Sequence, residues 1–469
     1  MTFSSDYKKN KADLKQSLRI SESFDLICKD TMIGGKNACF FFVDGLTKDE
    51  VMQKLLSGFY TIKQADMPGN ASDFVTEQLP YVEVDVVINI EQTITSVLSG
   101  MTAILIEGYD AAICMDVRTY PARSVDQPEK EKVLRGSKDG FVETVVFNTA
   151  LIRRRIRDPR LTMEMLSIGS ISHTDVVLCY MDGMVDQKLL DSVREKLKNL
   201  NAKSLSMNQT SLAECIYERK WYNPFPKYKY TERPDTSAAS ILEGNLVILV
   251  DTSPSAIILP TSIFGIMEEA DDYYLPPITG TYLRLARFLI STITFFITPT
   301  ILLLTMYPEW IPEWLSFIKL QEYTHVPLMF QFLILEVAVD GLKLAAVNTP
   351  NMLSTPLSII AGLALGEYAV SSGWFNAEAM LYMAFVALAN YTQPSYELGY
   401  ALKFFRIITV ILTGFFGLFG LIAGTIILII ALLSNHTLDG RRRYLYPLIP
   451  FNWKILKRQL LRLRRDEDS

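Results

Sequence analysis

The sequence predicts an α/β cytoplasmic region of two related subdomains, followed by an α-helical transmembrane domain. Residues 288–307 and 407–433 contain no charged residue, and each stretch is long enough to cross a bilayer. A helix rises about 1.5 Å per residue, so roughly twenty apolar residues span a hydrocarbon core of about 30 Å. A strand–turn–helix pattern that occurs twice before residue 285 predicts the duplicated α/β region.

Composition divides the 469 residues into six segments. They are a poorly ordered N-terminal segment at 1–37, a first α/β subdomain at 38–125, a basic helical linker at 126–160, a second α/β subdomain with a pre-membrane segment at 161–285, a helical membrane domain at 286–434 and a basic cytoplasmic tail at 435–469. The N-terminus lacks the apolar stretch of a signal peptide, so we expect the soluble part to stay in the cytoplasm with reduced thiols.

The sequence contains none of the usual signatures of catalysis or metal binding. Its five cysteines are scattered without a CxxC pair, and three histidines make a zinc site improbable. Phosphate-binding glycine loops and hydrolase or metalloprotease motifs are also missing. We therefore predict that the protein is not an enzyme and needs no cofactor.

The duplicated pattern begins with a buried strand. Residues 38–43 read ACFFFV, end at Asp44-Gly45 and lead into a helical segment; residues 175–181 read DVVLCYM, end at Asp182-Gly183 and do the same. Later, SVLSGMTAILIEGYDAAICMD parallels SILEGNLVILVDTSPSAIILP about 140 residues downstream, and both contain Leu-x-Gly where a helix is expected to end. These pairs predict an internal repeat over 38–125 and 161–262, with coincidence between two ordinary α/β units as the alternative.

A predicted helix at 141–157 ends in a basic cluster. Its arginines are Arg153, Arg154, Arg155, Arg157 and, just beyond, Arg160. Basic side chains complement the helix dipole at a C-terminus, so one interpretation is a solvated, well-capped linker helix. The other is contact with lipid phosphate or an acidic partner surface. Nucleic acid is not expected, because aromatic side chains do not alternate with these arginines.

Charges around the first apolar segment predict its orientation. Arg284 and Arg287 precede it, and Glu309 and Glu313 follow it, which places the N-terminal region on the cytoplasmic side. The acidic pairs at 268–269 and 271–272 are expected to lie on a solvated surface. Basic residues between 441 and 465 favour a cytoplasmic tail that touches anionic lipid.

The apolar segment at 326–347 contains three ionisable residues on one helical face: Glu336, Asp340 and Lys343. Ionisable groups in a bilayer usually face a water-filled cavity or a partner. The face therefore suits an interfacial helix, polar packing between helices in which Asp340 and Lys343 partly neutralise each other, or the lining of an ion pathway. Residue spacing alone does not separate these interpretations.

Three further apolar segments complete the membrane domain. Residues 353–370 contain Glu367, which either reaches the headgroups or faces a pathway; residues 377–390 are short for a crossing. Four glycines in the last segment, Gly414, Gly417, Gly420 and Gly424, indicate tight helix contact or a break. Cytoplasmic ends require an even number of crossings. We predict four crossings plus one interfacial or re-entrant helix, or a last segment that folds back on itself.

Long stretches of the chain resemble one family. RRRIRDPRLTMEMLSIGSISHTDVVLCYMDG, TERPDTSAASILEGNLVILVDTSPSAIILP and THVPLMFQFLILEVAVDGLKLAAVNTP resemble the A subunits of GerA-type spore germinant receptors, from about residue 35 onward. Nutrient-sensing members carry a Glu-Ala stretch near an Arg-x-Pro, where this chain reads LKLAAVNTP. The resemblance therefore implies an accessory or amplifying role in germination.

The same resemblance implies a location and an activity. It implies an inner spore membrane protein whose A-type subunits form a ring-like homo-oligomer and a channel for monovalent cations, beside a separate membrane partner subunit. It also favours the ion-pathway interpretation of the Glu336, Asp340 and Lys343 face. The rival hypothesis is a non-conducting scaffold or signalling subunit.

Overall fold

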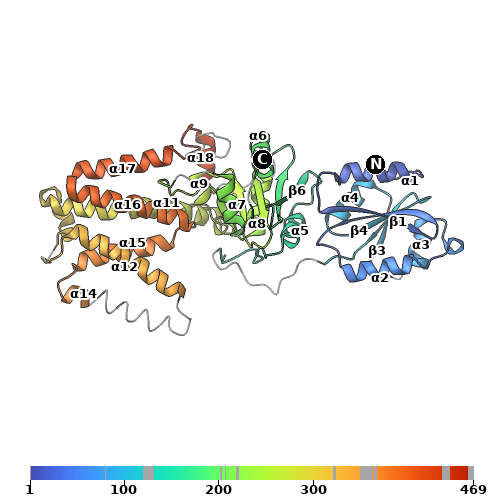
Figure 1. The fold of residues 1–469 in the computed structure, drawn as a ribbon, viewed down its shortest axis with the longest axis horizontal. Coiled ribbons are helices and arrows are strands. Elements are labelled where there is room, and N and C mark those ends of the chain that lie inside the picture. The colour runs from blue at the N-terminus through green and yellow to red at the C-terminus, as the bar shows by residue number, and fades with distance from the viewer. Residues whose placement is uncertain are drawn as a thin grey trace. The chain divides into compact units, whose positions relative to one another are not determined.

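The computed structural model describes residues 2–79, 81–119, 131–200, 203–205, 207–217, 221–320, 324–348, 362, 366, 368–435 and 444–462. The chain forms two compact units (Figure 1). Unit 1 contains Met1–Arg219 and Tyr228–Pro260, and unit 2 contains Lys220–Lys227 and Thr261–Ser469.

The first half of unit 1 is a five-stranded antiparallel sheet with the order β1-β2-β4-β5-β3. Its elements are α1 (Tyr7–Leu18), β1 (Leu26–Ile33), β2 (Lys36–Val43), α2 (Asp49–Phe59), η1 (Gln64–Asp66), α3 (Ala71–Gln78), β3 (Val84–Val87), α4 (Ile90–Leu98), β4 (Thr102–Ile106) and β5 (Ala112–Met115). Helices α1 and α4 cover one face, and α2 and α3 cover the other (Figure 1). Because strand side chains alternate, Phe41 of β2 enters the first core and Phe40 enters the second.

The second half of unit 1 repeats this architecture. Its elements are α5 (Val145–Arg155), β6 (Leu161–Ile168), β7 (Thr174–Met181), α6 (Gln187–Lys198), α7 (Asn208–Ile216), β8 (Lys229–Thr231), α8 (Pro234–Leu242), β9 (Leu246–Val250) and β10 (Ala256–Leu259). The sheet order β6-β7-β9-β10-β8 matches the first sheet element for element. Gly100 and Gly244 follow equivalent helices with φ of +98° and +87°, the left-handed conformation predicted for them. The structure therefore contains the predicted internal repeat.

An asparagine clasp identifies the first helix of each repeat. The side-chain amide of Asn10 donates to the main-chain oxygen of Ser4 at 2.6 Å and accepts from its main-chain N–H at 3.0 Å. Asn148 makes the same two bonds with Val142, at 2.6 and 2.8 Å. Helices α1 and α5 are therefore equivalent elements, and each asparagine fixes the chain that enters its helix.

This equivalence corrects two predicted boundaries. Residues 1–37 are not poorly ordered, because they contribute α1 and β1 to the first repeat. The predicted basic linker at 126–160 contains α5, which is the opening helix of the second repeat. The apolar residues of α1 are few and separated by charges, but Leu14 and Leu18 are fully buried, so composition concealed a packed helix.

The substitution Asn148→Ala is expected to lower the free energy of unfolding by about 1–3 kcal/mol, because Val142 loses a donor and an acceptor beside the core. Thermal unfolding of the full-length protein, followed by circular dichroism, measures the change. Asn199→Ala at the exposed end of α6 is the matched control and should change stability by less than about 0.5 kcal/mol. Equal effects of the two substitutions would contradict a structural role for the clasp.

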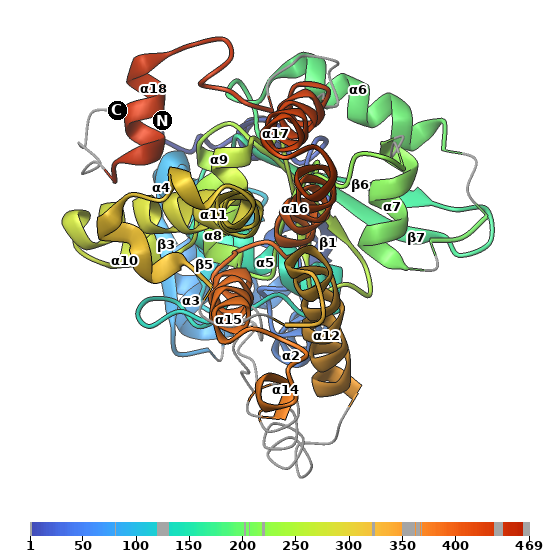
Figure 2. The same cartoon turned by 90° about the vertical axis from the view of Figure 1, so that its left-hand side faces the viewer.

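Unit 2 is helical. Its elements are α9 (Ile263–Ile266), α10 (Asp271–Tyr274), α11 (Pro277–Met306), η2 (Pro308–Trp310), η3 (Glu313–Ile318), α12 (Leu328–Asn348), α14 (Tyr368–Ser371), α15 (Ala377–Tyr391), α16 (Tyr396–Phe416), α17 (Leu418–Leu433) and α18 (Trp453–Leu460). In Figure 2, α17, α16 and α12 lie in a row with α11 and α15 beside it. Leu302, Phe332, Met383 and Val410 bring α11, α12, α15 and α16 into one apolar core.

The last apolar segment is not a single span. The helix breaks at Gly417, whose φ of +57° and ψ of −130° suit glycine, and α17 returns along α16 (Figure 1). A Cβ at Gly420 would lie 1.9 Å from the main-chain oxygen of Leu412, and one at Gly424 would lie 2.4 Å from the hydroxyl of Thr409. The glycines thus supply both the break and the tight contact, and the segment at 407–433 folds back on itself.

Two described helices, α11 and α16, are long and apolar enough to cross a membrane, and α17 is a shorter apolar helix. The segment at 353–370 lies mostly outside the described residues. The count of four crossings plus one interfacial or re-entrant helix therefore stays a prediction.

Candidate functional site

A buried ionic cluster joins three helices of unit 2. Its centre is Glu336 of α12, which is 5 % exposed. Arg406 of α16 places Nε and Nη2 at 2.7 and 2.6 Å from Glu336 Oε1, and Lys403 Nζ lies 3.2 Å from Oε2. Arg406 also donates to the main-chain oxygen of Thr294 in α11, at 3.2 Å. Charge pairing therefore offsets part of the desolvation cost of burying these side chains.

The open side of the cluster is formed by Asp340 and Lys343. Asp340 Oδ2 lies 2.5 Å from Lys403 Nζ, and the Asp340 side chain is 32 % exposed. Its other oxygen, Oδ1, is buried and has no hydrogen-bond partner among the described residues. Lys343 Nζ lies 4.9 Å from the ring centre of Tyr391 and 5.7 Å from that of Tyr400, within cation–π range. Asp340 thus forms its ion pair with Lys403 of α16. The sequence of α12 alone had suggested Lys343 as its partner.

The structure brings together the three charged residues predicted on α12. Their partners Lys403 and Arg406 were not predicted as site residues. They are spaced three apart, so they share one face of α16 and meet acids spaced four apart on α12. Such complementary charges in two apolar helices are the signal that could have identified the pair. Glu367, the fourth candidate, lies outside the described residues.

The basic end of α5 does not form a single surface. Arg153 is completely buried, and its Nε lies 2.7 Å from Asp25 Oδ2. Its Nη2 donates to Ser23 Oγ at 3.1 Å and to the main-chain oxygen of Leu161 at 3.0 Å. Lipid or partner contact by Arg153 was therefore a wrong expectation, because this guanidinium bonds the two repeats together inside unit 1.

The other predicted arginines lie nearer the surface. Arg155 is partly buried and pairs with Asp139 at 2.7 Å, whereas Arg154 and Arg157 are exposed. Burial raises the pKa of Asp139, but the hydrogen bond from Ser137 and the pairing with Arg155 together outweigh it and lower the pKa to about 2. Arg154 and Arg157 are therefore the residues on which a surface contact stays a prediction.

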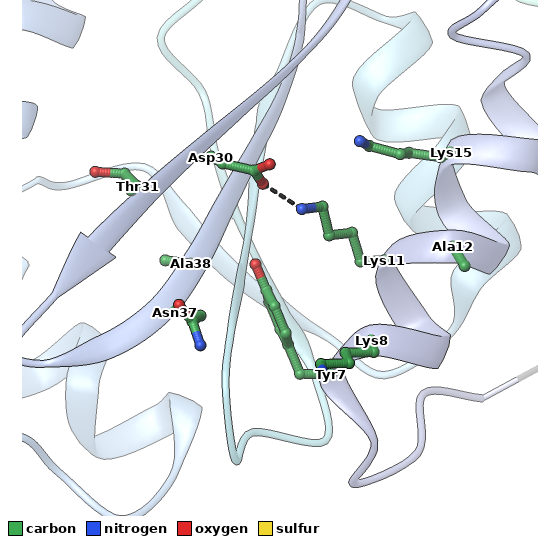
Figure 3. Close-up of a pocket in the computed structure, with 9 residues that line it drawn as sticks. All are labelled: Tyr7, Lys8, Lys11, Ala12, Lys15, Asp30, Thr31, Asn37 and Ala38. Carbon is green, nitrogen blue, oxygen red and sulfur yellow. Dashed lines mark ion pairs between the residues drawn. The ribbon is translucent and has the colours of Figure 1, made fainter.

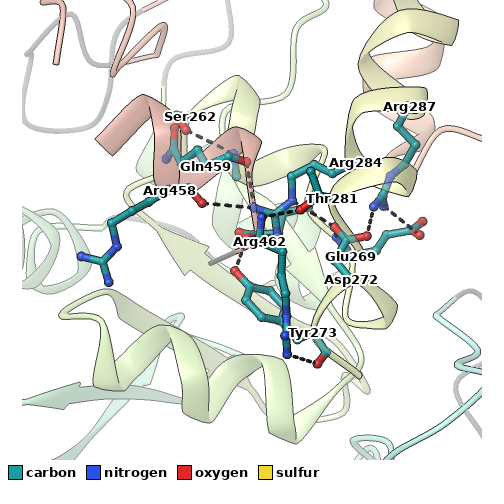
Figure 4. Close-up of polar contacts among 12 residues, drawn as sticks. Ser262, Glu269, Asp272, Tyr273, Thr281, Arg284, Arg287, Arg458, Gln459 and Arg462 are labelled. Atoms are coloured by element: carbon teal, nitrogen blue, oxygen red, sulfur yellow. Dashed lines mark hydrogen bonds and ion pairs between the residues drawn. The ribbon is translucent and has the colours of Figure 1, made fainter. Parts of the chain in front are cut away.

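A second ionic cluster lies at the start of α11 (Figure 4). Asp272 is fully buried and pairs with both Arg284 and Arg287, so the acidic pair at 271–272 is not simply a solvated surface as expected. Arg284 also reaches Glu268 at 2.8 Å, and Arg287 reaches Glu269 at 2.9 Å. The two arginines that predict the orientation of the first apolar segment therefore also have a structural role, as ion-pair partners of these acids.

The same cluster holds the C-terminal helix. Arg284 Nη1 donates to the main-chain oxygen of Gln459 at 2.7 Å, beyond which the main-chain N–H of Arg462 donates to Thr281 Oγ1 at 3.0 Å (Figure 4). Arg462 Nη2 donates to the main-chain oxygen of Tyr273 at 2.6 Å. Part of the basic tail is therefore attached to the segment that enters the first long apolar helix.

Comparison with known proteins identifies a family for this chain. Residues 12–468 match the family described as Bacillus/Clostridium GerA spore germination protein. Stage V sporulation protein AF of Bacillus subtilis is 37% identical over 455 residues, which cover 97% of this chain and 92% of that protein. Spore germination protein KA of the same organism is 27% identical, covering 97% and 84%.

Among solved structures, the crystal structure of the N-terminal domain of the A subunit of the Bacillus megaterium spore germinant receptor GerK3 is similar. It is 24% identical, covers 55% of this chain and 96% of that chain, and has a TM-score of 0.42. The family match over nearly the whole chain confirms the resemblance found in the sequence motifs. The chain belongs to the GerA family of spore germination proteins.

Proposed function

We propose that this chain is an A-subunit-like membrane protein of the germination machinery and that it forms a homo-oligomeric channel for monovalent cations. Family membership supports the role in germination, and helices α11 and α16 support a membrane location. In this proposal the chain crosses the inner spore membrane several times, with unit 1 and the C-terminal tail in the spore core. A membrane partner subunit belongs to the same assembly.

The observation that carries the proposal is the open side of the cluster on α12. Asp340 presents one carboxylate oxygen to Lys403, and its second oxygen is buried without a hydrogen-bond partner among the described residues, although the side chain as a whole is partly exposed. A partly exposed carboxylate in a membrane helix can replace part of the hydration shell of a cation. In a closed ring, each copy would contribute one Asp340 to the ion pathway.

The alternative is a non-conducting scaffold or signalling subunit. The pairing of Glu336 with Arg406 and Lys403 favours it, because these contacts satisfy charges inside one copy of the unit. Under this alternative Asp340 would be an edge residue of a structural network, and ions would not cross the protein.

Ion flux from liposomes that contain the purified full-length protein tests the proposal. The protein is reconstituted alone and with a co-expressed membrane partner, and its oligomeric mass is measured in parallel. A channel predicts potassium efflux from an oligomer. We expect Asp340→Asn to reduce the flux about tenfold, which corresponds to a loss of about 1.4 kcal/mol of cation stabilisation. Glu309→Gln, at an exposed position after α11, is the matched control and should conduct like the parent.

The oligomeric mass of Asp340→Asn must equal that of the parent for the comparison to apply to conduction. Equal flux from Asp340→Asn and the parent would exclude Asp340 from the pathway. An absence of flux from both preparations, with a monomeric mass, would replace the channel with the scaffold.

We extend the proposal to anionic lipid. Helix α18 carries Lys454 and Lys457 next to Phe451 and Trp453, which are 67 % and 63 % exposed. Aromatic rings beside basic side chains suit the headgroup region of a cytoplasmic leaflet. Weaker binding of Lys454→Gln/Lys457→Gln to liposomes that contain phosphatidylglycerol, with unchanged binding to neutral liposomes, is the expected result. Unchanged binding to both would refute the contact.

A further inference from the structure

Two cysteines of unit 1 face each other across neighbouring strands. In the register of β1 and β2, Cys28 lies opposite Phe41 and Cys39 lies opposite Asp30, so the two cysteines are diagonal neighbours. Their Sγ atoms are 2.7 Å apart. Cys28 is partly exposed, whereas Cys39 is fully buried. The Cys28 thiol can therefore react with a reagent from solvent, and the buried Cys39 thiol lies next to it.

Helix α1 places two lysine side chains near this pair. Lys11 pairs with Asp30, whose carboxylate lies within 4.8 Å of both thiols, and Lys15 follows one turn later. Figure 3 shows Tyr7, Lys11 and Lys15 on α1 beside the strand that carries Asp30. They line a pocket of about 440 Å³ over the same strands. Neither cysteine lines this pocket, but Asp30 does, so a small polar reagent has room to come within reach of the carboxylate that lies beside both thiols.

The environment gives the two thiols different chemistry. The hydrogen bond with Cys39, helped by the charges of Lys15 and Lys11, lowers the pKa of Cys28 to about 7 despite its partial burial. The same hydrogen bond, together with burial, raises the pKa of Cys39 above its ordinary value. Near neutral pH, Cys28 therefore supplies a thiolate and Cys39 keeps its proton.

We propose that Cys28 and Cys39 are a redox-active dithiol, which a small peroxide oxidises to a disulfide. The Cys28 thiolate attacks one peroxide oxygen, the O–O bond breaks, and hydroxide leaves with a proton from solvent as water. The sulfenic acid on Cys28 then reacts with the Cys39 thiol, and a second water leaves as the S–S bond forms. Two thiols lose two electrons in total, and the peroxide gains them.

A metal site is a weaker use of the same residues. Two thiols and a carboxylate are common zinc ligands, but the Asp30 carboxylate is already paired with the ammonium group of Lys11. The positive charges of Lys11 and Lys15 disfavour the binding of a metal cation and favour the thiolate form of Cys28. The charge pattern therefore supports oxidation of the pair over metal binding.

The test uses the full-length protein in detergent with Cys215→Ser, because Cys215 is the exposed cysteine. Five cysteines less one leave four thiols. After treatment with hydrogen peroxide and denaturation, we expect the thiol count to fall from four to two. Peptide mass spectrometry should find residues 28 and 39 cross-linked with the loss of two hydrogens, reversed by dithiothreitol.

Two matched variants in the same background locate the reaction. Cys28→Ser should keep all three of its remaining thiols, whereas Cys114→Ser, which removes a buried cysteine from β5, should fall from three to one. Alkylation of Cys28 by iodoacetamide should reach half of its maximal rate near pH 7. Loss of thiols from Cys28→Ser, an unchanged count in the parent, or Cys28 oxidised to sulfinic acid with Cys39 free would each overturn the proposal.

Discussion

Replacing Glu336 with methionine is expected to lower the free energy of unfolding of unit 2 by about 3–5 kcal/mol. The substitution removes the carboxylate that pairs with Arg406 and Lys403, and it leaves the buried Arg406 guanidinium without its charge partner. Removing one member of a buried ion pair costs more than removing both, because the remaining charge stays desolvated. Thermal unfolding in detergent, followed by the helical circular dichroism signal, measures the loss.

The double substitution Glu336→Met/Arg406→Met distinguishes charge pairing from packing. It leaves Asp340 paired with Lys403 at 2.5 Å, so the double variant should be more stable than Glu336→Met alone. Glu309→Met, at an exposed position, is the control and should change stability by less than about 0.5 kcal/mol. If the double variant were less stable than the single variant, volume rather than charge would decide the role of Glu336.

Replacing Asp25 with alanine is expected to destabilise unit 1 by about 3–5 kcal/mol. The substitution leaves the completely buried Arg153 guanidinium without its anionic partner at 2.7 Å. Because Arg153 also bonds Ser23 and Leu161, the loss should loosen the contact between the repeats. Hydrogen exchange of the peptides that cover α5 and β6 in the full-length protein measures the effect.

Two further variants serve as controls for the Asp25→Ala result. Asp25→Leu/Arg153→Met removes both charges and should recover part of the lost protection. Asp191→Ala removes the exposed partner of Arg194 and should leave exchange in α5 unchanged, because surface ion pairs contribute about 0–1 kcal/mol. Normal protection of α5 in Asp25→Ala would show that the buried pair does not hold the repeats together.

The duplicated fold could be predicted from local patterns. The buried strand at 38–43, the glycines at 100 and 244, and the helical segment after Asp182-Gly183 all follow from neighbours in the chain, and the structure contains each of them. The extent of each repeat could not be predicted in this way. Helix α1 is rich in lysine, and its burial depends on α4 and the sheet, which lie far from it in sequence.

The candidate site could also be predicted only in part from the sequence. Spacing alone placed Glu336, Asp340 and Lys343 on one face, because a helix turns about 100° per residue. Their partners come from α16, 67 and 70 residues beyond Glu336. Residue spacing carries no information on which helix covers that face. It therefore did not separate polar packing between helices from the lining of an ion pathway.

The family, the repeat and the division between α/β and apolar helical regions could be inferred from the sequence, because they depend on local composition, periodicity and long motifs. Which charges are buried and paired could be seen only in the folded chain. Arg153 read as a surface residue and Asp272 as a solvated one, yet both are buried against partners from distant segments. Desolvation penalises an unpaired charge wherever it lies in the chain, and only folding shows which opposite charge reaches it.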